Sequence, residues 1–464
     1  MITFLRRRIP APIKDVAKNY IGVIPPGYRL GRHYKTTQRF LRLAQWWNSD
    51  RIKTWQLQKL QELIAYAYKN VPGYYHLYNT AGVKPESIRS LDDIRTLPFV
   101  TKELIRDNLP DFTSRAIPKY EHVYVSTGGS TGVPFGFFQT ARNRQIEYAF
   151  MHLGWQRTGW SLGKISAELR GRFLGSEEKF WKYDNYDRTL LLSSYYLTDK
   201  TYDRYVSKIF AYRPQYLKAY PSAATMLADL LLTQNQVGRI TFRIIFLGSE
   251  NLYDWQKAKL MEAFPAAKLF AWYGHAEQVI LAAMCEKSDQ YHIWPFYGLT
   301  ELSDEQGKEV QRGEKGELVG TSFWNYATPF IRYRTQDLAK KGDSYCHDCG
   351  RQFQLLENLD GRLQEIIISR TGRYISMAAM NMHSNVFEHV KQFQFQQRTR
   401  GEVKFVIVGK PNYPEQDTQR IYHDLSQKLG SDIDLEIAFA DTIAKPPNGK
   451  FRFLKQELQI KYGE

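Results

Sequence analysis

Apolar residues recur at helical spacing through the first 120 residues of the chain. One face of a predicted helix carries Leu57, Leu60, Leu63, Ile64 and Ala67. The segment Asn70–Gly73 ends this run, because Pro and Gly both interrupt a helix. Ser90–Ile94 is typical of a short capped helix, and Thr101 predicts the N-cap of the next helix. We therefore predict a mostly helical region over residues 1–120.

After residue 120 the pattern changes to short apolar strands that alternate with helices. The predicted strands are Val123–Val125, Gln215–Tyr220, Arg243–Leu247 and Lys268–Trp272. The predicted helices are Arg142–Trp155, Ser222–Leu232 and Asp254–Phe264. Strands that alternate with helices in this way are typical of a parallel sheet with crossover helices. The middle of the chain is therefore predicted to be α/β.

The pattern changes twice more toward the end of the chain. Tyr291–Leu356 is rich in strand formers separated by turns, which indicates a β-rich subdomain. Beyond Gly361 the spacing predicts three strands and one helix, namely Ile366–Ile368, Glu402–Val408, Leu435–Phe439 and Pro414–Leu429. The predicted fold class is α/β: a large N-terminal domain with parallel sheets, crossover helices and the β-rich subdomain, followed by a small C-terminal α+β domain. The predicted divisions are 1–120, 121–360 and 361–464.

Composition adds constraints on class and compartment. With 464 residues, 43% hydrophobic and 24% charged, the chain is too long for one ordinary core and too apolar for disorder. No run of 18 apolar residues predicts a transmembrane helix. The basic residues Arg6–Arg8 follow the apolar start instead of preceding it, unlike a secretory signal, so we expect a cytoplasmic protein. Three cysteines exclude a disulfide framework.

The formal net charge of +16 favours contact with polyanions. The basic residues are scattered, with short clusters at Arg6–Arg8 and Lys340–Lys341, and no nucleic-acid-binding motif accompanies them. Nucleic acid is therefore not an expected partner. Loose attachment to the anionic inner face of a membrane stays an open expectation.

The strongest local motif is a loop of glycine and hydroxyl residues that follows the strand Val123–Val125. It reads Ser126, Thr127, Gly128, Gly129, Ser130, Thr131, Gly132, Val133, Pro134. The glycines let the backbone approach a ligand closely, and the hydroxyl and N–H groups can surround phosphate oxygens. No Lys follows the last Gly, so this is not a Walker loop. A flexible surface turn is the alternative, which so dense a run after a strand disfavours.

This loop resembles the phosphate loop of the adenylate-forming superfamily, within its phenylacetate–coenzyme A ligase branch. Other segments resemble family motifs in the right order: Ala271–Glu277, Gly316–Val319 with Thr328–Asp337, Asp360–Arg362, and Pro446–Lys450. In the family these are the Tyr-Gly-x-x-Glu segment, a strand pair that ends in a ribose-binding Asp, the interdomain hinge and the catalytic-lysine loop. The similarity covers roughly residues 90–460. It is greatest to ligase-like proteins associated with capsule or surface-polysaccharide synthesis.

The resemblance implies that a carboxylate attacks the α-phosphate of ATP, which gives an acyl-adenylate and pyrophosphate. Ser126–Gly132 would hold the phosphates. Tyr273 would stack beside adenine, and Asp337 would accept hydrogen bonds from the ribose hydroxyls. Arg362 would reach ribose or phosphate as a mobile C-terminal domain closes over the site.

The resemblance also implies three catalytic residues. Lys450 would bridge the carboxylate and the α-phosphate and neutralise charge that builds in the transition state. Glu277 would hold Mg²⁺, and Thr127 would act within the phosphate loop. Taken alone, a Lys after Asn-Gly is usually a solvated turn residue, so only its place among the other motifs favours catalysis. Lys445 is the nearby alternative.

Two positions depart from the family pattern. Gln336 precedes Asp337 where Gly is common, and Gln364–Glu365 stands in the hinge where Asp is common. Neither departure removes a charge that adenylation needs. A changed hinge bears on the domain rotation that the family uses for thioester formation, so it affects that step more than adenylation.

The family's acyl pocket lies between the phosphate loop, Gly248–Asn251 and the segment around Tyr273. The residues expected around nucleotide and acid are Gly248, Ser249, Glu250, Trp272, Tyr273, Gly274 and His275. Gly248–Asn251 ends a predicted strand, where α/β sheets bind ligands. The polar character of these residues favours a small, aryl or polar acid over a long fatty acid. For His275, a pocket wall and an ordinary buried His both stay open.

The cysteines follow a zinc-ligand spacing. Cys346 and Cys349 form a C-x₂-C pair followed by Gly. One pair cannot complete a tetrahedral site, so Cys285 and His292 are the expected remaining ligands, and similar placements in the resembling branch support this choice. His347 is the substitute fourth ligand. We predict a closed structural Zn²⁺ site beside the pocket, with buried free thiols or a redox pair as the alternatives.

Three functions stay open. The first is an ATP-dependent acid ligase that passes the acyl group to a thiol, with coenzyme A as the favoured acceptor. The second passes it to an amine or hydroxyl, such as a sugar-linked acceptor in surface-polysaccharide synthesis. The third is a catalytically inactive binding protein of the same fold, which intact Lys450, Glu277 and Asp337 disfavour. The acid and the oligomeric state, a dimer among the options, stay undetermined.

Overall fold

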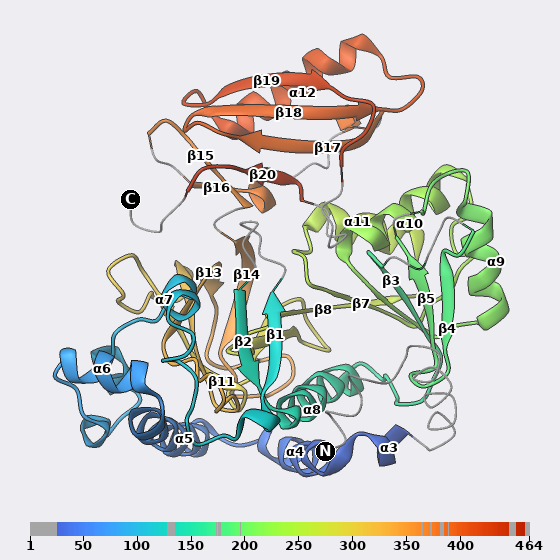
Figure 1. The fold of residues 1–464 in the computed structure, drawn as a ribbon. Helices are drawn as coiled ribbons and strands as arrows, with labels where there is room; N and C mark the ends of the chain where they lie inside the picture. Colours follow the sequence, from blue (N-terminus) through green and yellow to red (C-terminus); the bar gives the residue numbers. More distant parts are fainter. Residues whose placement is uncertain are drawn as a thin grey trace.

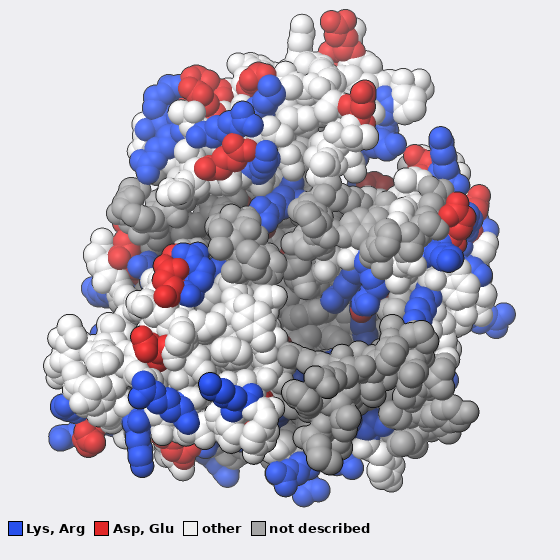
Figure 2. All heavy atoms as spheres, viewed as in Figure 1, with Lys and Arg blue, Asp and Glu red and all other residues white. Residues whose placement is uncertain are grey.

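The computed structural model describes residues 26–127, 135–172, 174, 178–194, 196–362, 365–371, 374–380, 385–387, 389–444 and 452–459. Within these ranges, no helix combines the length and apolarity needed to cross a membrane. On the face shown in Figure 2, Lys and Arg side chains alternate with Asp and Glu instead of gathering in one patch, in line with the scattered charges of the sequence. Cytoplasmic location and loose membrane contact stay predictions.

Helices form the first part of the described chain. They are α3 (Pro26–Arg29), α4 (Gly31–Ala44), α5 (Ser49–Asn70), α6 (Pro72–Thr80) and α7 (Lys102–Asp107), with short 3-10 turns at Pro85–Ser87, Asp92–Thr96 and Lys119–Glu121. The predicted apolar stripe lies in α5, where it is largely buried against neighbouring helices and the large sheet. Thr101 caps α7 by accepting a hydrogen bond from the Leu104 N–H at 3.2 Å. Satisfying this N–H fixes where the helix begins.

A 12-stranded mixed sheet forms the centre of the molecule, in the order β11-β12-β13-β14-β10-β9-β8-β7-β6-β3-β5-β4. Its strands are β3 (Ser166–Arg170), β4 (Trp181–Asp184), β5 (Thr189–Ser193), β6 (Tyr216–Ala219), β7 (Ile244–Gly248), β8 (Lys268–Gly274), β9 (Leu281–Met284), β10 (Tyr291–Ile293), β11 (Gly298–Ser303), β12 (Lys315–Ser322), β13 (Tyr333–Lys341) and β14 (Leu355–Arg362). The run β5-β3-β6-β7-β8 is parallel, and the strands on both sides of it pair antiparallel. The predicted α/β class is confirmed.

The parallel strands are covered on both faces. Helices α9 (Tyr202–Tyr212), α10 (Pro221–Thr233) and α11 (Asp254–Ala263) lie on one face, and α8 (Ala141–Arg157) lies on the other (Figure 1). Every residue of β7 is buried, as expected for a strand with helices on both sides. This burial leaves the carboxyl ends of the strands as the open edge of the core.

A short hairpin stands beside this edge. Its strands β1 (Val123–Thr127) and β2 (Phe135–Gln139) pair antiparallel, with Ser126 opposite Gly136 and Thr127 opposite Phe135. The described residues on either side of positions 128–134 are therefore held next to each other.

The C-terminal part forms its own sheet and core. A two-stranded sheet, β15 (Ile366–Ile368) and β16 (Tyr374–Ser376), precedes a four-stranded sheet in the order β19-β18-β17-β20, built from β17 (Val390–Gln397), β18 (Glu402–Gly409), β19 (Asp434–Phe439) and β20 (Leu454–Gln456). Helix α12 (Glu415–Leu429) packs on it, and 3-10 turns occupy Met377–Met380 and Asn385–Phe387. Figure 1 shows this part above the open edge of the large sheet. The predicted division at residue 360 stays a prediction.

Candidate active site

A cleft of about 1070 Å³ lies at the carboxyl ends of the parallel strands. Its lining comes from β3, β6 and β8, from the loop after β7, from α8 and from β13. Arg452, Leu454 and Gln456 line it from the small C-terminal sheet. This is where open α/β sheets bind ligands, and the cleft is bordered by both parts of the chain.

One end of the cleft brings together four predicted residues. The Tyr273 hydroxyl on β8 donates a hydrogen bond to Asp337 Oδ2 on β13 at 2.6 Å. The Tyr333 hydroxyl donates to Glu277 Oε1 at 3.2 Å, and Nδ1 of His275 lies 3.9 Å from Glu277 Oε2. Asp337 and Glu277 are both buried. The centres of the Tyr273 and His275 rings lie 5.7 Å apart, so the two carboxylates lie at the same end of the cleft, although 64 residues separate Tyr273 from Asp337.

The turn before Asp337 explains one departure from the family pattern. Gln336 has a φ of 62°, in the left-handed region where glycine is the usual residue. Its N–H donates to Glu317 Oε1 at 3.0 Å. Nε of Arg334 donates to the other carboxylate oxygen of Glu317 at 2.8 Å. The buried Glu317 therefore holds a backbone conformation that a Gly would adopt without strain.

The loop after β7 is shaped by a close contact with Trp272. A Cβ atom at Gly248 would lie 2.5 Å from the Trp272 ring, so only glycine fits there. Ser249 follows with a φ of 69°. Oε2 of Glu250 accepts a hydrogen bond from the Ser222 N–H at 3.0 Å, at the start of α10. Trp272 thus forms part of the cleft wall and Gly248 leaves room for its ring, whereas the Glu250 carboxylate is engaged with a helix N-terminus.

The hinge residue Glu365 contacts the large sheet. Its Oε2 accepts hydrogen bonds from Asn251 Nδ2 at 2.9 Å and from the Tyr253 hydroxyl at 3.4 Å. The Tyr253 ring also lies 5.6 Å from that of Phe453, which belongs to the small C-terminal part. Glu365, which stands near the position where the family commonly has Asp, therefore ties the small part to the loop after β7.

Part of the predicted site lies outside the described residues. This holds for Gly128, Gly129, Ser130, Thr131, Gly132, Lys445 and Lys450, and for the side chains of Thr127 and Arg362. Ser126 is exposed and lines the cleft. The backbone of Arg362 pairs with Asp337 in the β13–β14 ladder. The roles assigned to these residues stay predictions.

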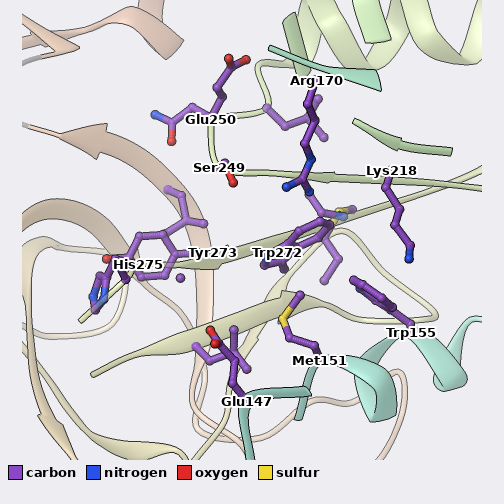
Figure 3. A pocket seen from close by; sticks show the side chains of 18 of the residues that line it. Glu147, Met151, Trp155, Arg170, Lys218, Ser249, Glu250, Trp272, Tyr273 and His275 are labelled. Atoms are coloured by element: carbon purple, nitrogen blue, oxygen red, sulfur yellow. The ribbon is translucent and has the colours of Figure 1, made fainter. Parts of the chain in front are cut away.

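The other end of the cleft contains residues that the sequence analysis did not single out. Figure 3 shows Arg170 and Lys218 extending from the sheet toward a space bordered by Trp272, Met151 and Trp155. The pattern that could have revealed them is a charged residue inside a strand whose neighbours are apolar. Leu217 and Ala219 are buried on either side of Lys218, so a lysine between them must face a polar space.

Glu147 on α8 lies below Trp272 in this cleft (Figure 3). Burial raises the pKa of Glu147 to about 7. Hydrogen bonds from Gln278 and Tyr297 favour the charged form and partly oppose this rise. Gln278, with a φ of 57°, donates its side-chain amide to the Glu147 carboxylate. This carboxyl group therefore changes charge near neutral pH.

The four predicted metal ligands form a compact cluster. The ligand atoms of Cys285, His292, Cys346 and Cys349 all lie within 4.8 Å of one another. Sγ of Cys285 is 3.9 Å from that of Cys346, and Sγ of Cys349 is 3.7 Å from His292 Nε2. With Zn–S bonds of about 2.3 Å, the edges of a tetrahedral zinc site are about 3.8 Å long. The donor set and its spacing therefore fit Zn²⁺.

The surroundings of this cluster fit the same ion. Burial, with the charges of Arg157 and Arg351, lowers the pKa of His292 to about 3, so its ring is neutral. Burial raises the pKa of Cys346 to about 12, and a bound cation would be needed to keep it as thiolate. His347, the substitute ligand, is exposed and packs edge-on against Tyr345, so the structure brings His292 to the cluster instead.

Comparison with known proteins agrees with this geometry. The family model of the CapK C-terminal domain matches residues 367–457. Protein CapK of Staphylococcus aureus is 21% identical over 98% of this chain and 99% of its own length. A phenylacetate-coenzyme A ligase of Thermus thermophilus is 27% identical over 69% of this chain and 72% of its own length. This chain is a relative of both proteins.

The fold points the same way. The solved structure of a 2-hydroxyisobutyryl-CoA ligase, in complex with an acyl-AMP in the postadenylation state, is 19% identical and covers 89% of this chain and 91% of its own. The TM-score is 0.71, so the two chains share their fold. The resemblance to the phenylacetate–coenzyme A ligase branch of the adenylate-forming superfamily, which the motifs indicated, is confirmed.

Proposed function

We propose that this relative of the phenylacetate–coenzyme A ligases activates a carboxylic acid with ATP and passes the acyl group to a thiol, with coenzyme A as the favoured acceptor. The observation that carries the proposal is the meeting of Tyr273, Glu277 and Asp337 at one end of a cleft. Relatives named as coenzyme A ligases support the reaction class. The acid itself is not identified by them.

In the first step a carboxylate oxygen attacks the α-phosphorus of ATP. The bond from that phosphorus to the bridging oxygen breaks, and pyrophosphate leaves with the electron pair. A carboxylate can accept several hydrogen bonds. Asp337 therefore accepts hydrogen bonds from the ribose hydroxyls as well as from the Tyr273 hydroxyl. The Tyr273 ring, fixed by that bond, lies beside the adenine. Both contacts hold the nucleotide so that the α-phosphate faces the acid.

Glu277 is the proposed protein ligand of Mg²⁺, which when bound neutralises phosphate charge. Its carboxylate is buried and oriented by the Tyr333 hydroxyl at 3.2 Å. Oxygen donors of this kind suit Mg²⁺, which keeps several waters and takes one or two carboxylates. Lys450 is proposed to neutralise the two anions as they meet.

In the second step the thiolate sulfur attacks the acyl carbon, and AMP leaves with the oxygen that joined it to the acyl group. The link from Glu365 to Asn251 and Tyr253 must break or shift if the small part rotates between the steps. Transfer to an amine or hydroxyl in surface-polysaccharide synthesis is the alternative, favoured by the resemblance to capsule-associated ligase-like proteins. A catalytically inactive binding protein is the remaining alternative.

The test is ATP–pyrophosphate exchange with a panel of aryl, amino, hydroxy, dicarboxylic and sugar acids. Exchange with one acid class is the expected result. Mass spectra of the products with and without coenzyme A then distinguish a thiol acceptor from an amine or hydroxyl. If folded protein binds ATP and exchanges with no acid, the adenylation proposal is wrong and the binding-protein alternative gains weight.

We also propose one structural Zn²⁺ per chain, held by Cys285, His292, Cys346 and Cys349. Its closed ligand set would fix the loop after β9 to the loop before β14. Cys346→Ser should remove stoichiometric zinc and lower the melting temperature by about 5 °C or more, because metal binding contributes directly to folding free energy. His347→Ala is the matched control and should keep the metal. Unchanged zinc in Cys346→Ser would contradict this ligand set.

A further inference from the structure

The distal end of the cleft, defined by Arg170 and Lys218, carries charge that the proposed adenylation chemistry does not use. Lys218 lies on β6, in register with Glu168 on the parallel neighbour β3. Arg170 is two residues beyond Glu168 on the same strand, so its side chain points to the same face and nearer the open edge. Two cations therefore project from adjacent strands into one space (Figure 3).

Neither cation forms a direct ion pair with a carboxylate of the described residues, and Glu168 and Asp187 act on Lys218 only as neighbouring charges. Nζ of Lys218 lies 4.9 Å from the centre of the Trp155 ring. The Arg170 guanidinium lies 5.3 Å from the centre of the Tyr220 ring, and its buried Nε has no acceptor in the described chain. An aromatic face compensates only part of the cost of removing a cation from water.

The charges of the nearby carboxylates Glu168 and Asp187 raise the pKa of Lys218, but both groups are also engaged elsewhere. Glu168, the closest carboxylate in the strand register, forms an ion pair with Arg172 at 2.5 Å. Burial and the charge of Asp184 raise the pKa of Asp187, and this carboxyl group is shared among the charges of Lys218, Arg29 and Arg144. Burial lowers the pKa of Lys218, so an anion bound there would favour its charged form.

The position of this space relates it to the activated acid. Trp272 and Ser249 lie between the Tyr273 end of the cleft and the distal end (Figure 3). Met151, Trp155 and Trp272 give the intervening wall an apolar surface. An acid whose carboxylate faces the nucleotide would extend its chain along this wall and bring its far end to the two cations.

We propose that the activated acid carries a second anionic group, a carboxylate or a phosphate, which Arg170 and Lys218 bind at the distal end of the cleft. This inference rests on the proposed function, because it names the substrate class of the same site. The planar guanidinium can bind either anion with two parallel hydrogen bonds, and the ammonium adds a point charge. The apolar wall then selects the distance between the two anionic groups.

The test compares acids in matched pairs that differ only in the second anion. Succinate against butyrate, glutarate against pentanoate and 3-phosphoglycerate against glycerate serve as probes in ATP–pyrophosphate exchange. In at least one pair we expect kcat/KM to be at least tenfold higher for the dianionic acid. Lys218→Met, which keeps the length of the stem, and Arg170→Met should each remove most of that preference and leave exchange with the monoanionic acid within about threefold.

Lys208→Met is the matched control. Lys208 is also partly buried, and its Nζ lies 4.0 Å from the centre of the Trp181 ring, but it is outside the cleft lining. This variant should keep the wild-type preference for dianionic acids. It thereby distinguishes the general effect of removing a lysine that packs on a tryptophan ring from the specific effect of losing the distal subsite. Melting temperature and ATP affinity identify any variant that fails to fold.

The possible outcomes separate the inference from the proposed function. Exchange with monoanionic or amino acids that equals or exceeds exchange with every dianionic partner would overturn the inference and leave adenylation standing. A Lys218→Met variant that loses both acids of a pair equally would also overturn it. No exchange with any acid would overturn the proposed function and the inference with it.

Discussion

The two ends of the cleft differ in where their polar groups find partners. At the Tyr273 end, carboxylates accept hydrogen bonds from tyrosine hydroxyls of the protein, as in the 2.6 Å bond from Tyr273 to Asp337. At the distal end, Arg170 and Lys218 face aromatic rings, and neither forms a direct ion pair with a carboxylate of the described residues. The first end is organised before a ligand binds, whereas the second is completed by one.

This difference indicates which property each end controls. The Tyr273 end is proposed to hold the nucleotide, which is the same ligand whatever acid is present, so changes there should reduce activity with every acid by the same factor. The distal end meets only the acid, so changes there should alter the preference between acids. Each prediction below tests that division, beginning with the largest expected effect.

Lys450→Ala should lower ATP–pyrophosphate exchange by about 10²- to 10³-fold, because one transition-state charge contact is removed. The loss should be the same for monoanionic and dianionic acids, since Lys450 is proposed to act at the carboxylate being activated. Lys445→Ala is the matched control within the same segment and should keep most of the activity. Full activity in Lys450→Ala would contradict the mechanism, and loss in Lys445→Ala alone would move the role to that residue.

Asp337→Ala should raise the KM for ATP by about 10- to 100-fold, because a hydrogen bond to a charged group contributes about 1.5–3 kcal/mol. Tyr273→Phe removes only the hydroxyl that orients Asp337 and should cost about two- to tenfold. Steady-state kinetics at saturating acid measures both effects. If either variant changed the ratio between a dianionic acid and its monoanionic partner, the two ends would not be independent.

Glu147 lies between the two ends and should make stability depend on pH. Its pKa rises from 4.5 to about 7 in the folded chain, so the folded state binds the proton more tightly than the unfolded state. The contribution of Glu147 to the free energy of unfolding should therefore be greatest below about pH 4.5. It should fall by up to about 3 kcal/mol as pH rises through 7. In Glu147→Gln, denaturation measured across this range should lack that fall. An unchanged pH profile would show that the carboxyl group is not the cause.

Much of this architecture could be predicted because it depends on local pattern. The strands and helices from Tyr216 to Gly274 lie within a residue or two of their predicted bounds, since buried parallel strands and capped helices have strong sequence signatures. The family motifs likewise named Tyr273, Glu277 and Asp337 before the structure brought them together. Cysteine and histidine spacing named the four cluster residues.

What could not be predicted depends on contacts between distant segments. The strands β3 to β5 and β17 were missed, and in β3 the charged residues Glu168 and Arg170 interrupt the apolar run. The distal end of the cleft followed from the register of β3 and β6, which a single sequence does not reveal. The bond from Asn251 to Glu365 likewise joins residues 114 positions apart.

The departure at Gln336 lies at the Tyr273 end of the cleft and should have a small effect on stability. Gln336→Gly should stabilise the chain by about 0.5–1 kcal/mol. A residue other than glycine in the left-handed region costs about 1–2 kcal/mol, which the substitution relieves. Part of this gain is lost because glycine has more conformational freedom in the unfolded chain. Gln336→Ala, which keeps the left-handed strain at a φ of 62° and the N–H bond to Glu317, is the control and should change stability little. Chemical denaturation measures both variants.

Because the N–H bond to Glu317 persists in both, Asp337 should stay in place and the KM for ATP should be unchanged. A large rise in that KM for Gln336→Gly would mean that the glutamine side chain itself contacts the nucleotide, and that this end of the cleft also carries a feature specific to this chain.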